Sequence, residues 1–155
     1  MLESGDGLPP LSFNLSHTHG LVACAITSGS DVGVDVESIG RDVTDGVAER
    51  FFSERENADL RQCATAALRA RRFIELWTLK EAYVKAIGKG LSHSLNSIVF
   101  DPSDRESIRF LPPSDVEENS WRFALCAPTD AHCLAVAVRH DPQVLPRILV
   151  MSADS

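Results

Sequence analysis

Two short segments carry charged residues whose types and spacing suit phosphate chemistry. In "GVDVES", Asp35 and Glu37 are two positions apart, so on a strand both carboxylates project from one face. Neighbouring carboxylates repel unless water or a cation neutralises them, and oxygen ligands alone suit Mg²⁺ or another hard divalent ion. An exposed strand that ends in a turn would carry the same residues. The pair is therefore a candidate metal site or a solvated strand edge.

In "WTLKEAYVKAIGKG", Glu81 and Lys85 are four positions apart, so they become neighbours if this segment is helical. Glu81 could then bring a third carboxylate to the strand pair, and Lys85 could bind or protonate a phosphate oxygen. Mg²⁺ held by a few carboxylates keeps coordination positions for water and substrate phosphates. The clustering of Lys80, Lys85 and Lys89 also fits a phosphorylated ligand. A solvated helix with an ordinary ion pair, which contributes only ~0.3–0.5 kcal/mol, explains the same residues.

The segment around Glu81 and Lys85 has the periodicity of a helix with one buried side. At ~100° per residue these two side chains point roughly away from the apolar residues. The buried side is expected to consist of Leu76, Leu79, Tyr83, Ala86 and Ile87. A capping box of the S-x-x-E type at Ser53 predicts an earlier helix, and a second helical run is expected from about Arg71 to the stop signals Gly88 and Gly90.

Strand patterns flank the helices on both sides. "FNLSH", "LVACAIT" and "VGVDVE", within residues 13–37, predict a small antiparallel meander. "LNSIVF", "SIRFL", "WRFALCA" and "CLAVAVRH" predict a second set of strands. This order indicates an α+β fold with an antiparallel sheet packed against a long helix. We expect one domain over residues 13–142, after a flexible tail at 1–12 and before a C-terminal edge strand or tail at 143–155.

Composition excludes several classes of function. A chain of 155 residues with a net charge of -7 is unsuited to coating nucleic acid, which needs clustered basic residues. No apolar run approaches the ~20 residues of a membrane span, and the acidic start does not resemble a secretory signal, so we expect a cytoplasmic protein without a membrane partner. The cysteines have no CxxC pairing and fall in apolar stretches, which predicts reduced structural thiols at Cys24, Cys63, Cys126 and Cys133.

Four segments together resemble a known family. "FNLSHTHG", "GVDVES", "RFFSERE" and "LWTLKEAYVKAIGKGL", in this order and at these intervals, resemble the 4′-phosphopantetheinyl transferases of the surfactin-synthetase type. The resemblance covers residues 13–100 well and the later strands loosely. It implies a phosphopantetheinyl transferase-like fold and transfer of the phosphopantetheine arm of coenzyme A to a serine of an acyl or peptidyl carrier protein. It further implies Mg²⁺ dependence and release of adenosine 3′,5′-bisphosphate.

The resemblance also implies roles for individual acidic and basic residues. Asp35, Glu37 and Glu81 would hold Mg²⁺ against the coenzyme A pyrophosphate. Lys85 would help the leaving bisphosphate depart, as electrostatic partner or general acid, and Lys80 matches a second basic position. Either Glu81 or a metal-bound water would deprotonate the carrier serine, and the sequence does not choose between them.

Three further residues have both a family match and a local explanation. Ser16 and His17 match a Ser-His pair that contacts coenzyme A phosphates, although a Ser-His at a strand end is often turn chemistry. Glu56 matches a glutamate near the site, yet the capping box at Ser53 already explains it. His19 is left unassigned, because no cysteine or third histidine nearby completes a zinc set.

The resemblance has one large gap. Surfactin-type enzymes have two similar lobes with the site between them, whereas only about twelve residues precede "FNLSH" here. A homo-oligomer that rebuilds the cleft, a partner chain, or a shortened relative would each explain this, and we favour the homo-oligomer. The alternative to an enzyme is a catalytically weak module that binds coenzyme A or a carrier protein and needs a second chain.

Overall fold

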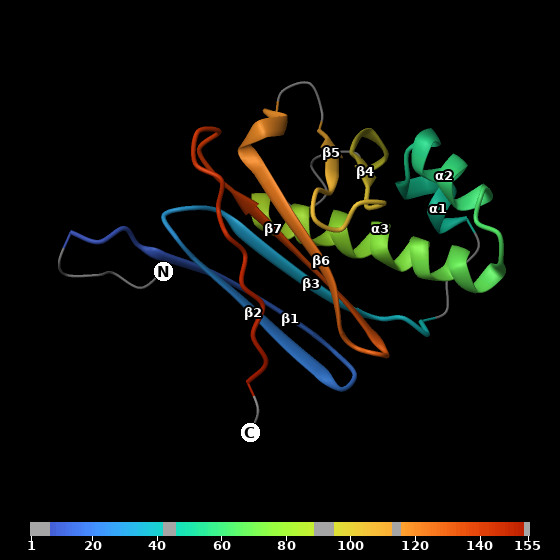
Figure 1. Cartoon of the computed structure of the whole chain (residues 1–155), viewed down its shortest axis with the longest axis horizontal. Helices are drawn as coiled ribbons and strands as arrows, with labels where there is room; N and C mark the ends of the chain where they lie inside the picture. Colours follow the sequence, from blue (N-terminus) through green and yellow to red (C-terminus); the bar gives the residue numbers. More distant parts are fainter. Residues whose placement is uncertain (1–6, 42–45, 89–94, 113–115, 154–155) are drawn as a thin grey trace.

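The computed structural model describes residues 7–41, 46–88, 95–112 and 116–153. Figure 1 shows a central antiparallel sheet crossed by one long helix, with a separate hairpin beside it. The sheet has the order β3-β7-β6, and its strands are β3 (Val32–Ser38), β6 (Trp121–Thr129) and β7 (His132–Arg139). The hairpin consists of β1 (Leu11–Thr18) and β2 (Leu21–Ser28), and a third antiparallel pair consists of β4 (Val99–Asp101) and β5 (Arg109–Leu111).

Among the described residues, three α-helices lie between β3 and β4 in the sequence. They are α1 (Val47–Phe51), α2 (Glu54–Arg61) and α3 (Ala66–Ile87), followed by short 3-10 turns at Leu95–Ser97 and Glu118–Ser120. Ser53 caps α2 with the expected capping box, in which Glu56 is the reciprocal partner. Helix α3 begins after Thr65, whose side chain accepts from the Leu68 amide, and ends at Gly88 with φ 66°. An α+β fold with an antiparallel sheet on a long helix is therefore confirmed.

Helix α3 packs against β3 at van der Waals distance, because β3 carries a glycine at the crossing. A Cβ atom on Gly33 would lie 2.0 Å from the carbonyl oxygen of Ala82 and 2.6 Å from the amide nitrogen of Ala86. No larger residue fits there unless the helix moves. The odd-numbered residues of β3 therefore face α3, and Asp35 follows Gly33 on that face.

The two faces of the sheet contact different clusters of apolar side chains. On the α3 face, Tyr83 is fully buried and lies against an aromatic group from the neighbouring strands, with ring centroids 4.9 to 6.4 Å apart. That group consists of Phe110, Trp121 and Phe123. On the other face, Val34, Val36 and Leu134 pack against the smaller residues of the hairpin. Leu76, Leu79, Tyr83 and Ala86 are buried as expected, whereas Ile87 is only half-buried.

Several details differ from the sequence-based expectations. The first three strands do not form one meander, because β3 pairs with β7, from the far end of the chain, and β1 and β2 pair with each other. The second helical run begins at Ala66 rather than near Arg71, and "LNSIVF" starts as a 3-10 turn. No strand is assigned within 143–153, so the structure does not support an edge strand there. Gly90, Lys89 and residues 1–6 of the expected tail lie outside the described residues.

The cysteines are free thiols, as expected, but not all of them are core residues. Cys133 is buried, and Cys63 and Cys126 are half-buried. Cys24 is exposed, because it lies on the outward face of the hairpin, so the expectation that it is a core hydrophobe is wrong. Within the described ranges, no helix has both the length and the apolar composition needed to cross a bilayer.

Candidate active site

Asp35 is the most deeply buried acid of the candidate site, with 5% of its surface exposed. One of its oxygens, Oδ1, accepts from Lys85 Nζ at 3.1 Å and from Ser16 Oγ at 3.4 Å. The other oxygen, Oδ2, is buried and has no hydrogen-bond partner among the described residues. A buried carboxylate oxygen without a partner is costly, and such an atom is a candidate ligand for a cation.

Lys85 joins α3 to β3 at this point. Its ammonium group also donates to the Val34 carbonyl oxygen at 3.2 Å, and its side chain remains 31% exposed. It can therefore reach both the buried carboxylate and the solvent. The sequence suggested an ion pair between Lys85 and Glu81, whereas in the structure Lys85 pairs with Asp35.

Strand β1 holds the edge of β3 through side chains of its inward face. Asn14 Oδ1 accepts from the Val34 amide at 2.9 Å, and Ser16 Oγ accepts from the Val36 amide at 3.1 Å. These bonds fix the backbone on both sides of Asp35. Ser16 is thus a positioning residue for the carboxylate. The role of Asn14 was missed, and the only sequence signal for it is the polar alternation in "FNLSHT".

Burial and neighbouring charges raise the pKa values of Asp35 and Glu81. Burial, followed by the nearby Glu37 and opposed by Lys85, raises the pKa of Asp35 from 3.8 to about 7. Burial also raises the pKa of Glu81, with Lys85 opposing the shift and Glu37 adding to it. Asp35, Glu37 and Glu81 therefore share one electrostatic environment, and a cation placed among them would relieve their repulsion.

The three acids have oxygen ligands that suit a divalent cation, but in this structure they are not gathered into a metal site. Among the described residues, no three His, Cys, Asp or Glu side chains lie close enough together to hold a metal ion. In this conformation the acids pair with cationic side chains, namely Asp35 with Lys85 and Glu37 with Arg41 at 3.0 Å. The free Oδ2 of Asp35 and the mutual repulsion of the acids suit a hard cation. Movement of Lys85 and Arg41 would be needed to gather them.

Ser16 and His17 do not share a face of β1. Ser16 is buried toward β3, whereas His17 is exposed on the opposite face of the hairpin and pairs in register with Val22. Consecutive strand residues project in opposite directions. One ligand lying on a single face of β1 therefore cannot contact both side chains, and only His17 is open to solvent.

Lys80 does not fit the role of a ligand-binding residue. Its side chain is 0% exposed, and its ammonium donates to the carbonyl oxygens of Leu95 and Ile98 at 2.6 and 2.5 Å. It also forms an ion pair with Glu56 at 2.7 Å. The expectation that Lys80 contacts coenzyme A is contradicted, because the ammonium is occupied inside the core. Glu56 likewise belongs to this core pair and to the capping box rather than to the carboxylate site.

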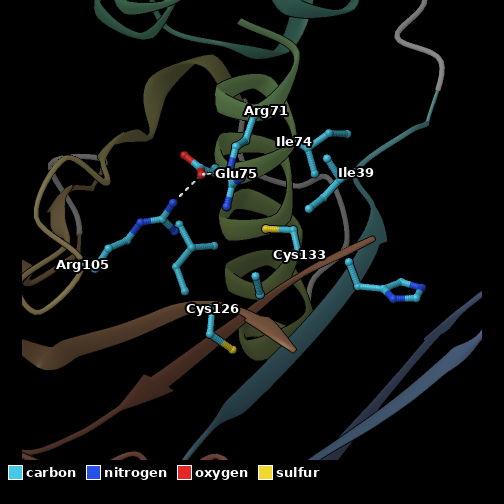
Figure 2. Close-up of a pocket in the computed structure, with 10 residues that line it drawn as sticks. Ile39, Arg71, Ile74, Glu75, Arg105, Cys126 and Cys133 are labelled. Atoms are coloured by element: carbon cyan, nitrogen blue, oxygen red, sulfur yellow. Dashed lines mark hydrogen bonds and ion pairs between the residues drawn. The ribbon is translucent and has the colours of Figure 1, made fainter. Parts of the chain in front are cut away.

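A cavity of about 270 Å³ lies beside the first half of α3, and its lining includes Cys133, the cross-strand partner of Glu37. Figure 2 shows Arg71 and Arg105 reaching toward the buried Glu75, with Cys126 and Cys133 nearby. Both arginines form ion pairs with Glu75, that of Arg71 at 3.5 Å. The three arginines of "RARR", residues 69–72, are all engaged within the chain. None of the residues expected in the site lines this cavity.

Comparison with known proteins agrees with the fold and the motifs. Residues 31–137 match the family profile of the 4'-phosphopantetheinyl transferase superfamily. The chain is 40% identical over 98 residues to 4'-phosphopantetheinyl transferase gsp of Aneurinibacillus migulanus, a match that covers 63% of this chain and 40% of that protein. It is 38% identical over 130 residues to 4'-phosphopantetheinyl transferase Sfp of Bacillus subtilis, which covers 77% and 56% respectively. It thus spans about half the length of the curated relatives it matches.

Solved structures of two synthases have the same fold as most of this chain. Holo-[acyl-carrier-protein] synthase of Thermotoga maritima aligns with a TM-score of 0.56 at 26% identity, over 71% of this chain and 62% of that one. The synthase of Bacillus anthracis, crystallised with CoA (3',5'-ADP), aligns with a TM-score of 0.59 at 20% identity, over 70% of this chain and 94% of that one. The family profile covers well over half of the 155 residues and includes both β3 and α3. This chain belongs to the 4'-phosphopantetheinyl transferase superfamily.

Proposed function

We propose that this chain transfers the 4′-phosphopantetheine arm of coenzyme A to a serine hydroxyl of an acyl or peptidyl carrier protein, in a reaction that requires Mg²⁺. The observation that carries the proposal is Asp35, a buried carboxylate with one free oxygen, held by Ser16 and Lys85 beside Glu37 and Glu81. The transferase names of the relatives support the reaction class.

Asp35, Glu37 and Glu81 would hold the Mg²⁺ ion. Once bound, the ion would neutralise charge on the coenzyme A pyrophosphate as the transition state forms. Lys85 would leave Asp35 and turn its ammonium toward a phosphate oxygen. Because 31% of the Lys85 side chain is already exposed, this movement does not require the helix to unfold.

In the proposed step, the serine Oγ of the carrier bonds to the phosphorus that bears pantetheine. The bond from that phosphorus to the oxygen of the adenosine 3′,5′-bisphosphate breaks, and the bisphosphate leaves with the electron pair. Glu81 is our candidate to accept the serine proton, because burial raises its pKa above that of an ordinary carboxyl group and so makes it a stronger base. A water molecule in the site is the alternative acceptor. Lys85 stabilises the departing phosphate as a cation or a proton donor.

Exposed side chains suggest which residues contact coenzyme A and where a second copy of the chain could bind. His17, exposed at the end of β1, is our candidate to contact a coenzyme A phosphate, and Ser16 acts indirectly by holding Asp35. We also propose a homo-oligomer as the form that completes the cleft. It is supported by apolar side chains of the hairpin that this chain leaves uncovered.

Mass measurement of carrier proteins tests the function. Purified chain is incubated with coenzyme A, Mg²⁺ and apo carrier proteins of the fatty-acid, polyketide and peptide types. We expect the mass of at least one carrier to increase by one phosphopantetheine group, and the increase to require Mg²⁺. Coenzyme A binding with no change in any carrier would instead identify a binding module.

Two substitutions test the acids. Asp35→Ala and Glu81→Ala should each reduce transfer by at least about 10³-fold, because each removes a group that acts on the transition state. Circular dichroism checks that the variants fold. Near-normal turnover in either variant would remove that residue from the proposed site.

A further inference from the structure

The β1–β2 hairpin has its large apolar residues on the outside. Its outward face, defined here as Leu11, Phe13, Leu15, His17, Val22, Cys24 and Ile26, is exposed on both strands. The inward face carries polar or smaller residues, including the Asn14 and Ser16 side chains that hold β3. An ordinary surface hairpin has the opposite arrangement, with the apolar face on the core.

The outward face is continuous because the register brings its residues together. Phe13 lies opposite Ile26, and Leu15 lies opposite Cys24. The five large side chains are 41 to 75% exposed. At roughly 200 Å² for a side chain of this size, they expose about 600 Å² together, close to the ~800 Å² that each partner buries in a standard interface. A patch of about 600 Å² is at the upper end of what a monomer exposes, and such a patch is often functional.

The composition of the hairpin selects the kind of partner. Residues 7–30 contain no Asp, Glu, Lys or Arg, although 24% of the whole chain is charged. A partner recognised by charge would find nothing to pair with on this face. Apart from His17 at its turn end, a second copy of the same face is apolar and uncharged. Two flat two-stranded sheets can pack face to face about 10 Å apart. Each copy would cover the apolar face that the other copy leaves exposed.

We propose that the outward face of the hairpin is a self-association surface, on which two copies of this chain pack about a two-fold axis through their β1–β2 hairpins. Such an interface is isologous, so each residue of the face meets the same face of the other copy. This assigns a surface to the proposed homo-oligomer, and it does not depend on the proposed transferase activity. The hairpin also holds β3 beside Asp35, so association would stabilise the element that positions the acid.

Cys24 is a natural reporter for this interface, because its thiol is exposed in the single chain and central on the outward face. Pure protein is treated with iodoacetamide over a range of concentrations, and labelling of Cys24 is followed by peptide mass spectrometry. We expect labelling to slow at least about tenfold as concentration rises and a dimer appears in sedimentation velocity. A monomer at every concentration, with Cys24 always open, would overturn the proposal.

A charge placed on the outward face should break the dimer. Ile26→Asp and, independently, Phe13→Asp are expected to raise the dimer dissociation constant about a hundredfold or more, since a carboxylate would be buried without a partner. Both residues are more than half exposed, so neither change disturbs the interior. Leu149→Asp is the matched control, as Leu149 is 66% exposed and lies outside the hairpin.

Other occupants of the face give different results. If Leu149→Asp separates the copies and the hairpin variants do not, the interface lies on the C-terminal segment and the proposal fails. If Cys24 becomes protected only when an apo carrier protein is added, the face binds the carrier and the proposal also fails. These measurements use no transfer assay, so loss of the proposed activity leaves them interpretable.

Discussion

At the scale of single residues, Asp35 combines burial with an incomplete set of partners. A charged carboxylate in this position is costly, and its raised pKa expresses that cost. Natural sequences accept such costs where a group must act on a ligand. Replacing Asp35 can therefore lower the activity and at the same time raise the stability of the protein, because a residue needed for a ligand does not have to stabilise the fold.

Replacing Asp35 with asparagine should stabilise the metal-free protein at alkaline pH. The folded pKa of about 7 lies above the ordinary 3.8, so the native acid favours folding only while protonated. Its contribution is present below pH 4 and is lost as the pH rises through 7. We expect Asp35→Asn to melt above the native protein at pH 8 in EDTA, with the difference narrowing steadily toward pH 4. A difference that grows on acidification would contradict the assignment.

Lys80 and Lys85 lie on one helix, but their substitution should have different effects: loss of Lys80 should mainly reduce stability, and loss of Lys85 should mainly reduce activity. Lys80 is fully buried with three oxygen partners, so Lys80→Met leaves the Glu56 carboxylate without its ammonium and should cost about 3–5 kcal/mol in urea unfolding. Lys85 is 31% exposed, and its partner Asp35, with a pKa of about 7, can take up a proton when the ammonium is lost, so Lys85→Met should cost less than Lys80→Met while abolishing transfer. Equal losses of stability in the two variants would refute this division.

At the scale of elements, the site depends on how closely β3 approaches α3. Gly33 permits that approach, and Asp35 follows it on the same face toward Lys85. The strand is also held from its other edge by β1. Asp35 is therefore positioned by three elements that are distant in sequence.

A methyl group at Gly33 should push β3 away from α3. Gly33→Ala places a Cβ 2.0 Å from a helix carbonyl oxygen, so we expect a loss of about 1–3 kcal/mol or more and a parallel loss of transfer. Gly40→Ala is the control, because nothing lies within 4 Å of a Cβ at that position. Chemical unfolding of both variants measures the difference. A Gly33→Ala protein as stable as Gly40→Ala would mean that the helix adjusts freely.

The sequence predicts the local parts of this arrangement better than the long-range ones. The capping box at Ser53 and the shared face of Asp35 and Glu37 follow from spacing of two or three residues. The pairing of β3 with β7 depends on residues about a hundred positions away, and no local pattern encodes it. Lys80 had an overlooked signal, since it is four residues after the buried Leu76 and so lies beside the apolar stripe. Its charge suggested a surface position, but the ion pair with Glu56 holds the ammonium inside the core.

At the scale of the whole molecule, charge and apolar surface are segregated. The chain carries a net charge of -7, yet residues 7–30 contribute no Asp, Glu, Lys or Arg. Two copies would therefore repel each other at long range while their hairpins attract at contact. Electrostatics disfavours association here, whereas burial of apolar surface favours it.

This opposition predicts the direction of the salt effect on self-association. Added salt shortens the Debye length from about 30 Å at 0.01 M to about 8 Å at 0.15 M, which screens the repulsion between two anionic copies but leaves the apolar contact intact. The dimer of the native protein should therefore tighten as NaCl rises over this range, measured by sedimentation at fixed pH. Docking by charge complementarity would weaken under the same change. An interface weakened by salt would thus have to use charged surface outside the hairpin, and the two hairpins would not be the contact.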